Sequence, residues 1–268
     1  PNATFYFRIQ FRVYTFKSQT YNSLNSIMKT TKQLGLFLAA AMLAFACSKP
    51  ADTVETTDAQ EVAQGEGQTL TVQPSATAIS WTGYKPSGKH FGKIPTTSGE
   101  VTVAGNSITS GTFTFDIPSL TIEDMEAGSE FHGKLHGHLL SADFFDAANY
   151  PTATFEITAV EPFAAGDVVA DKEEFKSEFT PSAVSELAPA NLTHWISGNL
   201  TMRGTTKNIK FPAAVSIENG KLTAKAGFNI DRTDWGLEYQ DEADVLDKAK
   251  DKFIYNTVSL VIDVTAGQ

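Results

Sequence analysis

The stretch GHLLSADFFDAANYPTATF, residues 137–155, decides the fold, because it joins a helical turn with two adjacent phenylalanines to the start of a strand. Tyr150 precedes Pro151, and a residue before proline is pushed out of the helical region, so the turn has to end there and an extended strand follows. Phe144 and Phe145 cannot both face water cheaply, since each ring buries roughly 150–250 Å². We expect this turn to fold inward and to plug one end of an apolar interior.

Strand patterns surround that turn. Residues 112–117, 222–230 and 258–264 alternate apolar and polar side chains, which predicts strands with one apolar face. Gly105-Asn106 and Asn219-Gly220 separate such strands and are typical of two-residue hairpin turns, because both dipeptides tolerate positive φ. Neighbouring strands should therefore be antiparallel, and the fold class is all-β, a barrel or a sandwich.

Helix is expected only in short pieces at the ends of the sheet. The sequence predicts a helical connection at residues 123–135 and short turns at residues 141–148 and 245–252. Residues 166–191 are partly charged and partly rich in Ser, Pro and Ala, so we interpret them as an inserted surface loop with some helix.

The first 68 residues carry a different kind of pattern. Residues 28–46 begin with Met28, continue with two lysines and an apolar run of about twelve residues, and end just before Cys47, the only cysteine. That layout predicts a lipoprotein signal peptide with Cys47 as the lipidated residue; the run is too short to span a bilayer core of ~30 Å. The alternative is an ordinary secretory signal with an incidental thiol. Residues 1–27 precede the first methionine, and we interpret them as translated upstream sequence outside the protein.

Residues 47–68 are rich in Thr, Ala, Asp, Glu and Gln and nearly free of large apolar side chains. Such a composition cannot bury enough surface to offset chain entropy, so we expect a disordered tether.

Charge narrows the possible partners. The chain has 21 Lys and Arg and 31 Asp and Glu, a net charge of −10, and the part from Cys47 onward has 16 against 31, a net of −15. Such an acidic protein repels phosphate backbones and anionic membrane surfaces. We therefore expect no nucleic-acid partner and membrane attachment only through a lipid anchor.

Six stretches in chain order resemble the YceI-like family of lipocalin-like, polyisoprenoid-binding periplasmic proteins. They are SWTG 80–83, GKHFG 88–92, FDIPSL 115–120, the stretch 137–155, ISGNLTMRGTTK 196–207 and FNIDRTDWG 228–236, the last with Trp235 where the family usually has Phe. The resemblance covers about residues 70–266 and implies an extended antiparallel barrel of about eight strands over residues 69–268. It also implies an amphipathic lipid in the barrel and a structural role for His138.

Apolar side chains should line that barrel. An eight-stranded barrel is just wide enough either to be filled by its own side chains or to hold one small ligand, so the pattern leaves both possibilities open. The resemblance favours a ligand tunnel, with Arg232 and Asp234 as a headgroup contact or, preferably, a structural ion pair. The expected lining residues are Trp81, Phe91, Phe113, Phe115, Leu139, Phe144, Phe145, Phe155, Leu200, Met202, Phe228 and Trp235.

Catalysis has little support in the sequence. His132 and His136 have a spacing that could hold one metal ion on a helix, but Gly133 and Gly137 interrupt it and no third ligand has a suitable spacing. Nucleophile elbows and phosphate-binding glycine loops are missing from the sequence. We expect no catalytic residue, no metal and no cofactor; a metal-dependent hydrolase is the weakest alternative.

These patterns together predict a lipid-anchored protein of the bacterial envelope, at the periplasmic face of the outer membrane or at the cell surface. It would bind a polyisoprenoid or a quinone-like lipid without catalysis. The alternative is a structural or stress-response envelope module with a solid barrel, which acts through an unknown protein partner.

Overall fold

The computed structural model describes residues 54–164, 174–242 and 252–267. The strands are β1 Thr56–Asp58, β2 Gln68–Thr71, β3 Ala78–Lys85, β4 Gly88–Ala104, β5 Ser107–Asp116, β6 Thr152–Pro162, β7 His194–Met202, β8 Thr205–Glu218, β9 Lys221–Asp231 and β10 Thr257–Gly267. The helices are α1 Glu130–Leu140 and α2 Val184–Leu187, with short 3₁₀ turns η1 Pro74–Ala76 and η2 Arg232–Trp235.

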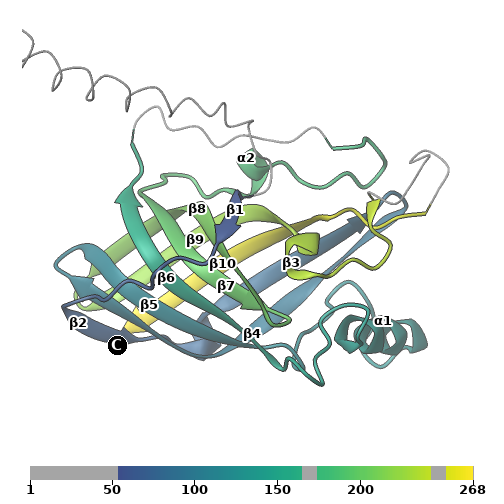
Figure 1. Ribbon diagram of the computed structural model, residues 1–268, viewed down its shortest axis with the longest axis horizontal. Coiled ribbons are helices and arrows are strands. Elements are labelled where there is room, and N and C mark those ends of the chain that lie inside the picture. Colours follow the sequence, from purple (N-terminus) through teal and green to yellow (C-terminus); the bar gives the residue numbers. More distant parts are fainter. Residues whose placement is uncertain (1–53, 165–173, 243–251, 268) are drawn as a thin grey trace, which may run out of the picture. The chain divides into compact units, whose positions relative to one another are not determined.

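Strands β3 to β10 form a closed antiparallel barrel, which confirms the predicted fold class (Figure 1). Within the described residues their order is β8-β7-β6-β5-β4-β3-β10-β9, and pairing of β8 with β9 closes the ring. Strand β2 adds to β4. Helix α1 lies at one end of the barrel and β10 ends at the other, so the two ends differ in what covers them.

The predicted hairpin turns are where the sequence places them. Ala104 pairs with Ser107 across Gly105-Asn106, and Glu218 pairs with Lys221 across Asn219-Gly220. Asn219 and Gly220 have φ of 52° and 74°, the positive values that a type I′ turn requires of both central residues. Arg203-Gly204 makes a further turn of this kind between β7 and β8, with φ of 47° and 74°.

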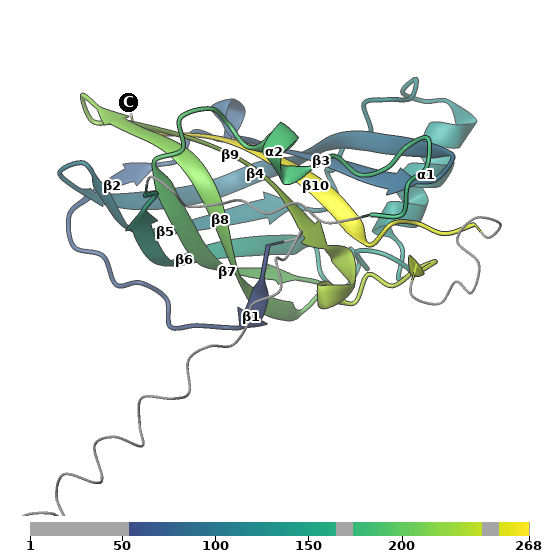
Figure 2. The same ribbon diagram turned by 90° about the horizontal axis from the view of Figure 1, so that it is seen from above.

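The tether prediction is wrong for residues 54–67, which lie along the outside of the barrel and are called the strap here (Figure 2). Strand β1 pairs with residues 207–209 of β8, and the Val54 N–H donates to the Asn229 carbonyl of β9 at 2.8 Å. Pairing of β8 with β9 covers only residues 213–218 of β8, so the strap fills the seam where these two strands separate. The strap is held by backbone hydrogen bonds and buried amides rather than by apolar side chains, so the composition of the sequence does not reveal that it is ordered.

Further along, the strap crosses β7 and β6. Asn199, 4% exposed, accepts from the Gln60 N–H at 3.0 Å and donates to the Gln60 carbonyl at 2.8 Å. The Ala63 N–H donates to the Ile157 carbonyl at 3.0 Å. A single buried asparagine thus satisfies both backbone groups of one strap residue.

The described part of the insertion, residues 174–191, covers the outer face of β9 and β10, with the helical turn α2 on top (Figure 2). A Cβ on Gly227 would lie 2.0 Å from the Leu187 carbonyl oxygen, so β9 needs a glycine at this contact. Beneath the loop, Phe175 packs with Phe253 and Tyr255 in a small cluster outside the barrel. Residues 166–173 lie outside the described residues.

The helix predicted at residues 123–135 needs a correction. Helix α1 begins at Glu130 rather than 123, because Ser129 caps it by accepting from the His132 N–H, and it continues to Leu140. Residues 141–148 form turns, as predicted. The turn predicted at 245–252 lies almost wholly outside the described residues. In the described part of the chain, every helix is too short or too polar to cross a membrane.

Candidate functional site

The barrel encloses a cavity of about 370 Å³ at the end that carries α1, called the outer cavity here. This volume lies in the range of small-molecule sites, about 300–1,000 Å³. Its wall comes mainly from apolar side chains of β3, β7 and β10, with single apolar side chains from β4, β5, β6 and β9. Its mouth comes from α1, the turn after α1 and residues 237–240. The barrel is therefore hollow at this end.

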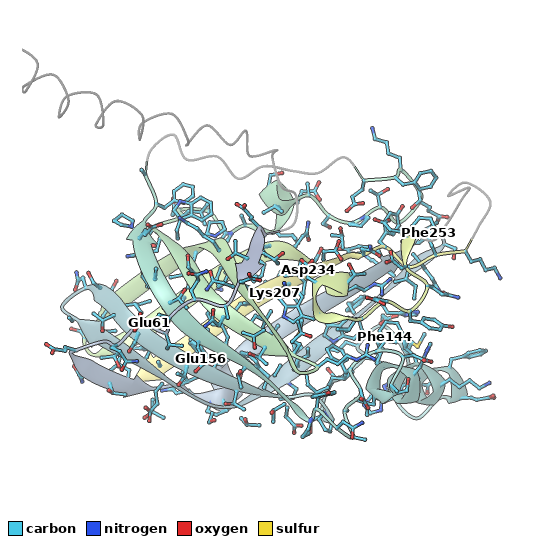
Figure 3. The ribbon with its side chains drawn as sticks, in the orientation of Figure 1. Glu61, Phe144, Glu156, Lys207, Asp234 and Phe253 are labelled. Atoms are coloured by element: carbon cyan, nitrogen blue, oxygen red, sulfur yellow. The ribbon has the colours of Figure 1, made fainter. Side chains whose placement is uncertain are left out.

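Aromatic rings line the outer cavity at the end that carries α1. Phe144 is 8% exposed and, with its neighbour Phe145, lines the cavity beside α1 (Figure 3). The Phe144 ring lies 5.5 Å from the Tyr239 ring, and His138 stands edge-on to both, at 5.1 Å and 4.5 Å between centroids. Edge-on packing of this kind is favourable beyond the area it buries. These rings are called the lid here.

Polar side chains shape the turn 141–149 that carries the lid. Asp146 adopts a φ of 48°, and the Asn149 Nδ2 donates to both oxygens of the Asp146 carboxylate at 3.0 Å. Asp and Asn tolerate this left-handed conformation better than other side chains. The Ser141 carbonyl accepts from the Phe144 N–H at 3.1 Å, which directs Phe144 inward.

A smaller space of about 100 Å³, the inner cavity, lies in the other half of the barrel. The two cavities share the side chains of Ile79, Phe115, Leu200 and Leu260, which are called the waist here. Beyond the waist, the aromatic cluster of the inner half fills most of the space, with centroids of Phe211 and Phe228 4.3 Å apart and those of Phe155 and Phe211 5.7 Å apart. This half is largely packed.

Arg232 is 3% exposed and lies at the wall of the outer cavity. Its guanidinium donates to the carbonyls of Leu237, Ile254 (3.1 Å) and Tyr255 (3.2 Å) and thus joins η2 to the chain before β10. Burial lowers the pKa of Arg232, and nearby carboxylates, Asp241 first, oppose that shift. The predicted pair with Asp234 does not form between these two described residues; Asp234 instead accepts from the Thr56 hydroxyl at 2.9 Å.

His90 and Asp124 form a polar contact beside the mouth. The His90 Nδ1 lies 2.8 Å from the Asp124 carboxylate, which also accepts from the Phe91 N–H at 3.0 Å. Burial by itself raises the pKa of Asp124, but the hydrogen bonds from Phe91 and His90 outweigh it, so the pKa lies below the ordinary value. The carboxylate stays ionised and holds His90 at the cavity wall.

Most of the predicted lining residues line one of the two cavities. The outer cavity has Trp81, Leu139, Phe144, Phe145 and Met202, the waist has Phe115 and Leu200, and the inner cavity has Phe113, Phe155 and Phe228. Two predictions are wrong. Phe91 is 39% exposed, because in β4 it alternates with the inward-facing His90. Trp235, the last residue of η2, is fully buried, and its indole N–H donates to the Leu200 carbonyl at 2.9 Å.

Sequence reasoning missed several wall residues. Three of them lie in the irregular chain after β9, where the sequence has no alternation of apolar and polar side chains to show which residues face inward. They are Tyr239, Gln240 and Ile254. Ile79 and Leu260 stand in alternating stretches and could have been found by continuing the alternation of Trp81 and of Val258.

The histidines of α1 have protein partners. The His132 and His136 rings stack 6.2 Å apart, and His136 Nε2 lies 3.2 Å from the Leu120 carbonyl oxygen. His138 Nε2 lies 3.2 Å from the Asp143 carboxylate. Among the described residues, no three His, Cys, Asp or Glu side chains group so that they could hold a metal ion.

Fold and cavity together define a small all-β barrel of the lipocalin-like kind, hollow at one end and lined there by the aromatic rings of the lid. The model of the YceI-like domain matches residues 70–266, and the chain belongs to this family. Comparison with curated proteins gave no match.

Solved structures of similar proteins include those from three bacteria. BcnA of Burkholderia cenocepacia is 18% identical with a TM-score of 0.48, over 73% of this chain and 99% of that one. A polyisoprenoid binding domain from Saccharophagus degradans implicated in plant cell wall breakdown is 14% identical with a TM-score of 0.46, over 77% and 99%. The YCEI protein of Campylobacter jejuni is 20% identical with a TM-score of 0.37, over 60% and 74%.

Proposed function

We propose that the protein binds a polyisoprenoid or a similar amphipathic lipid, such as a quinone, in the outer cavity and does not transform it. The observation that carries the proposal is an apolar cavity of about 370 Å³ under a lid of aromatic rings. The alternative, a barrel that is packed solid and acts only through a partner protein, would not contain a cavity of this size. Membership of the YceI-like family and the similarity to the polyisoprenoid binding domain of Saccharophagus degradans support a lipid ligand.

Affinity would come from the apolar wall. Each Å² of apolar lipid surface removed from water contributes roughly 25 cal/mol. Trp81, Met202 and Leu139 would contact the chain of the lipid, since they line the outer cavity. Lys85, His90 and Gln240 also border this cavity and would orient a polar head.

Several polar side chains around the outer cavity already have hydrogen-bond partners within the protein, which supports binding without catalysis. Arg232 donates to backbone carbonyls, His90 contacts Asp124 and His138 contacts Asp143, so each of these groups already serves the protein. General acid–base chemistry would require a group aimed at the substrate.

Native mass spectrometry of the protein purified from its own cells tests the proposal. A lipid adduct that disappears after extraction with organic solvent and returns on addition of a prenyl alcohol is expected. Absence of any copurified lipid, together with no binding of added prenyl chains, would reject lipid binding.

We further propose that the protein is anchored to the envelope through a lipid on Cys47. The layout of residues 28–47 and the single cysteine support this. In cells grown with an alkyne fatty acid, the wild type should become labelled and Cys47→Ser should not. An unlabelled wild type, or label retained by Cys47→Ser, would contradict lipidation at this residue and leave the barrel proposal standing.

A further inference from the structure

The barrel interior is divided into two spaces of unequal character. The outer cavity has about 370 Å³ and the inner cavity about 100 Å³. Their common wall is the waist, Ile79, Phe115, Leu200 and Leu260, contributed by β3, β5, β7 and β10. All four waist side chains are buried, each 9% exposed or less. A lipid chain that moves from the outer toward the inner cavity therefore has to pass these side chains.

Aromatic packing supports the waist from the inner side. Leu200 pairs with Phe155 across β7 and β6, and Leu260 pairs with Phe228 across β10 and β9. Phe155 and Phe228 both contact the Phe211 ring, with centroids at 5.7 Å and 4.3 Å. The waist is thus backed by a connected set of rings rather than by empty space, and a side chain that rotates away from a chain end would disturb this packing.

Gly198 shows how closely that cluster is fitted. A Cβ at residue 198 would lie 2.2 Å from the Cζ of Phe155, so only glycine lets the Phe155 ring lie over β7. The packing around the inner cavity therefore depends on a glycine in the backbone of β7 as well as on the aromatic side chains. The inner half resists expansion more than the outer half does.

We propose that the waist is the floor of the lipid site and limits the length of prenyl chain that the barrel can bury. This inference rests on the proposed lipid-binding function and adds the ligand class. The class is an amphipath with a short prenyl chain, or a longer one of which only the head-proximal or tail-end units enter. Since a volume of about 370 Å³ lies near the lower end of the range for small-molecule sites, a long chain would not fit in full.

Chain length provides the test. Farnesol, geranylgeraniol and solanesol are titrated into the full-length protein in a fixed detergent, with the intrinsic tryptophan fluorescence, to which Trp81 at the cavity wall contributes, as the readout. For the wild type, affinity should stop rising once the outer cavity is full, so solanesol should bind no tighter than geranylgeraniol. Leu200→Ala removes part of the floor and should bind the longer chains at least about tenfold tighter relative to farnesol, because more apolar surface is buried.

Ile209→Ala is the matched control. Ile209 is 1% exposed and lines the inner cavity without belonging to the waist, so its truncation enlarges the inner space and leaves the floor in place. Its length profile should equal that of the wild type. Phe115→Leu, a smaller change at the waist, serves if Leu200→Ala does not fold and should shift the profile in the same direction.

Two outcomes would overturn the inference while lipid binding stands: a wild-type affinity that climbs through solanesol, or identical length profiles for Leu200→Ala and Ile209→Ala. If none of the three alcohols binds to the wild type, the proposed function itself fails and the floor fails with it.

Discussion

Arg203 holds together the two loops that form the cavity mouth. Its guanidinium donates to the carbonyl of Ala142, just before the lid residue Phe144, at 2.6 Å, and to the carbonyl of Gly236 after η2. Arg203 itself lies in the turn between β7 and β8, about 60 residues after α1 in the sequence. Arg203 thus ties the turn that carries the lid to the loop after η2, and Phe144 and Phe145 pack against the barrel core.

Removal of the lid rings separates binding from stability. Phe144→Ala with Phe145→Ala should reduce lipid affinity by at least about tenfold, because the cavity would open to water. Stability should fall by less than the ~3–5 kcal/mol typical of Phe→Ala in a packed core, since both rings border a space. Lipid titration and urea unfolding of the same protein measure the two effects.

The control for the lid is Phe253, which is 2% exposed in the cluster beneath residues 174–191 and outside the barrel. Phe253→Ala should lower stability by about 3–5 kcal/mol and leave lipid affinity unchanged. If the lid variant instead lost stability like Phe253→Ala and kept its affinity, Phe144 and Phe145 would seal a core rather than a binding site.

Asp124 makes stability depend on acid. Its pKa is lower in the folded state than the ordinary value of about 3.9, so the folded state binds this proton less readily than the unfolded state does. The carboxylate therefore stabilises the fold at pH values above the ordinary pKa, and this contribution is lost as the pH falls through the folded pKa. Asp124→Asn should be less stable than the wild type at neutral pH and lose less stability on acidification.

Urea unfolding at a series of pH values between neutral and strongly acidic measures this slope. Glu130→Gln is the control, because the Glu130 side chain is 77% exposed on α1 and should alter the slope far less. Equal slopes for Asp124→Asn and the wild type would show that the contacts with Phe91 and His90 add nothing to folding.

Among the elements, the strap is the one whose removal tests how the barrel closes. Asn199→Ala would leave the N–H and carbonyl of Gln60 without their partner and is expected to cost about 1–3 kcal/mol. Amide hydrogen exchange at Val54 and Ala63 should accelerate, because both amides are held only while the strap lies on the barrel. Gln64→Ala, at an exposed strap side chain, is the control.

Protection of Val54 and Ala63 that is unchanged in Asn199→Ala would mean that backbone pairing of β1 with β8 suffices to hold the strap. The buried asparagine would then serve the barrel wall, where Asn199 also accepts from Asn208 at 3.0 Å.

Elements with periodic apolar side chains could be predicted from the sequence, and elements held by backbone groups could not. Alternation in 222–230 identified β9 and the Asn219-Gly220 turn before it. The strap has a polar composition because its neighbours supply hydrogen bonds, so the same residues that predicted disorder make β1. Phe91 failed for a simpler reason: a one-residue error in phase exchanges the two faces of a strand.

The site was predictable in its composition and not in its volume. An inward-facing Phe reads the same whether it borders a space, as Phe144 does, or stacks on another ring, as Phe228 does. Which of these occurs depends on contacts between strands far apart in the sequence, such as Phe211 on β8 against Phe155 on β6. Trp235 failed because its hydrogen-bond partner, the Leu200 carbonyl, is a backbone group.

At the scale of the whole molecule, the barrel combines two halves with different tasks. The inner half, with Phe155, Phe211 and Phe228, is packed and supplies stability, whereas the outer half encloses space. An apolar cavity leaves its lining atoms without partners on one side, so the protein forgoes part of the packing energy that a solid barrel would have. A lipid in the outer cavity would restore those contacts.

That difference makes lipid binding visible as stability. A ligand that binds only the folded state, at a free concentration of 100 times its Kd, raises the free energy of unfolding by about 2.7 kcal/mol. For a domain of this size the melting temperature should rise by roughly 5–10 °C, since each kcal/mol shifts it by about 2–4 °C. Thermal unfolding of delipidated protein with and without farnesol measures the shift. Isopentenol, which can bury little apolar surface, should give none, and the Phe144→Ala, Phe145→Ala variant should lose most of the farnesol shift because its outer cavity no longer excludes water. A farnesol shift of the same size in that variant would place the stabilising lipid somewhere other than under the lid.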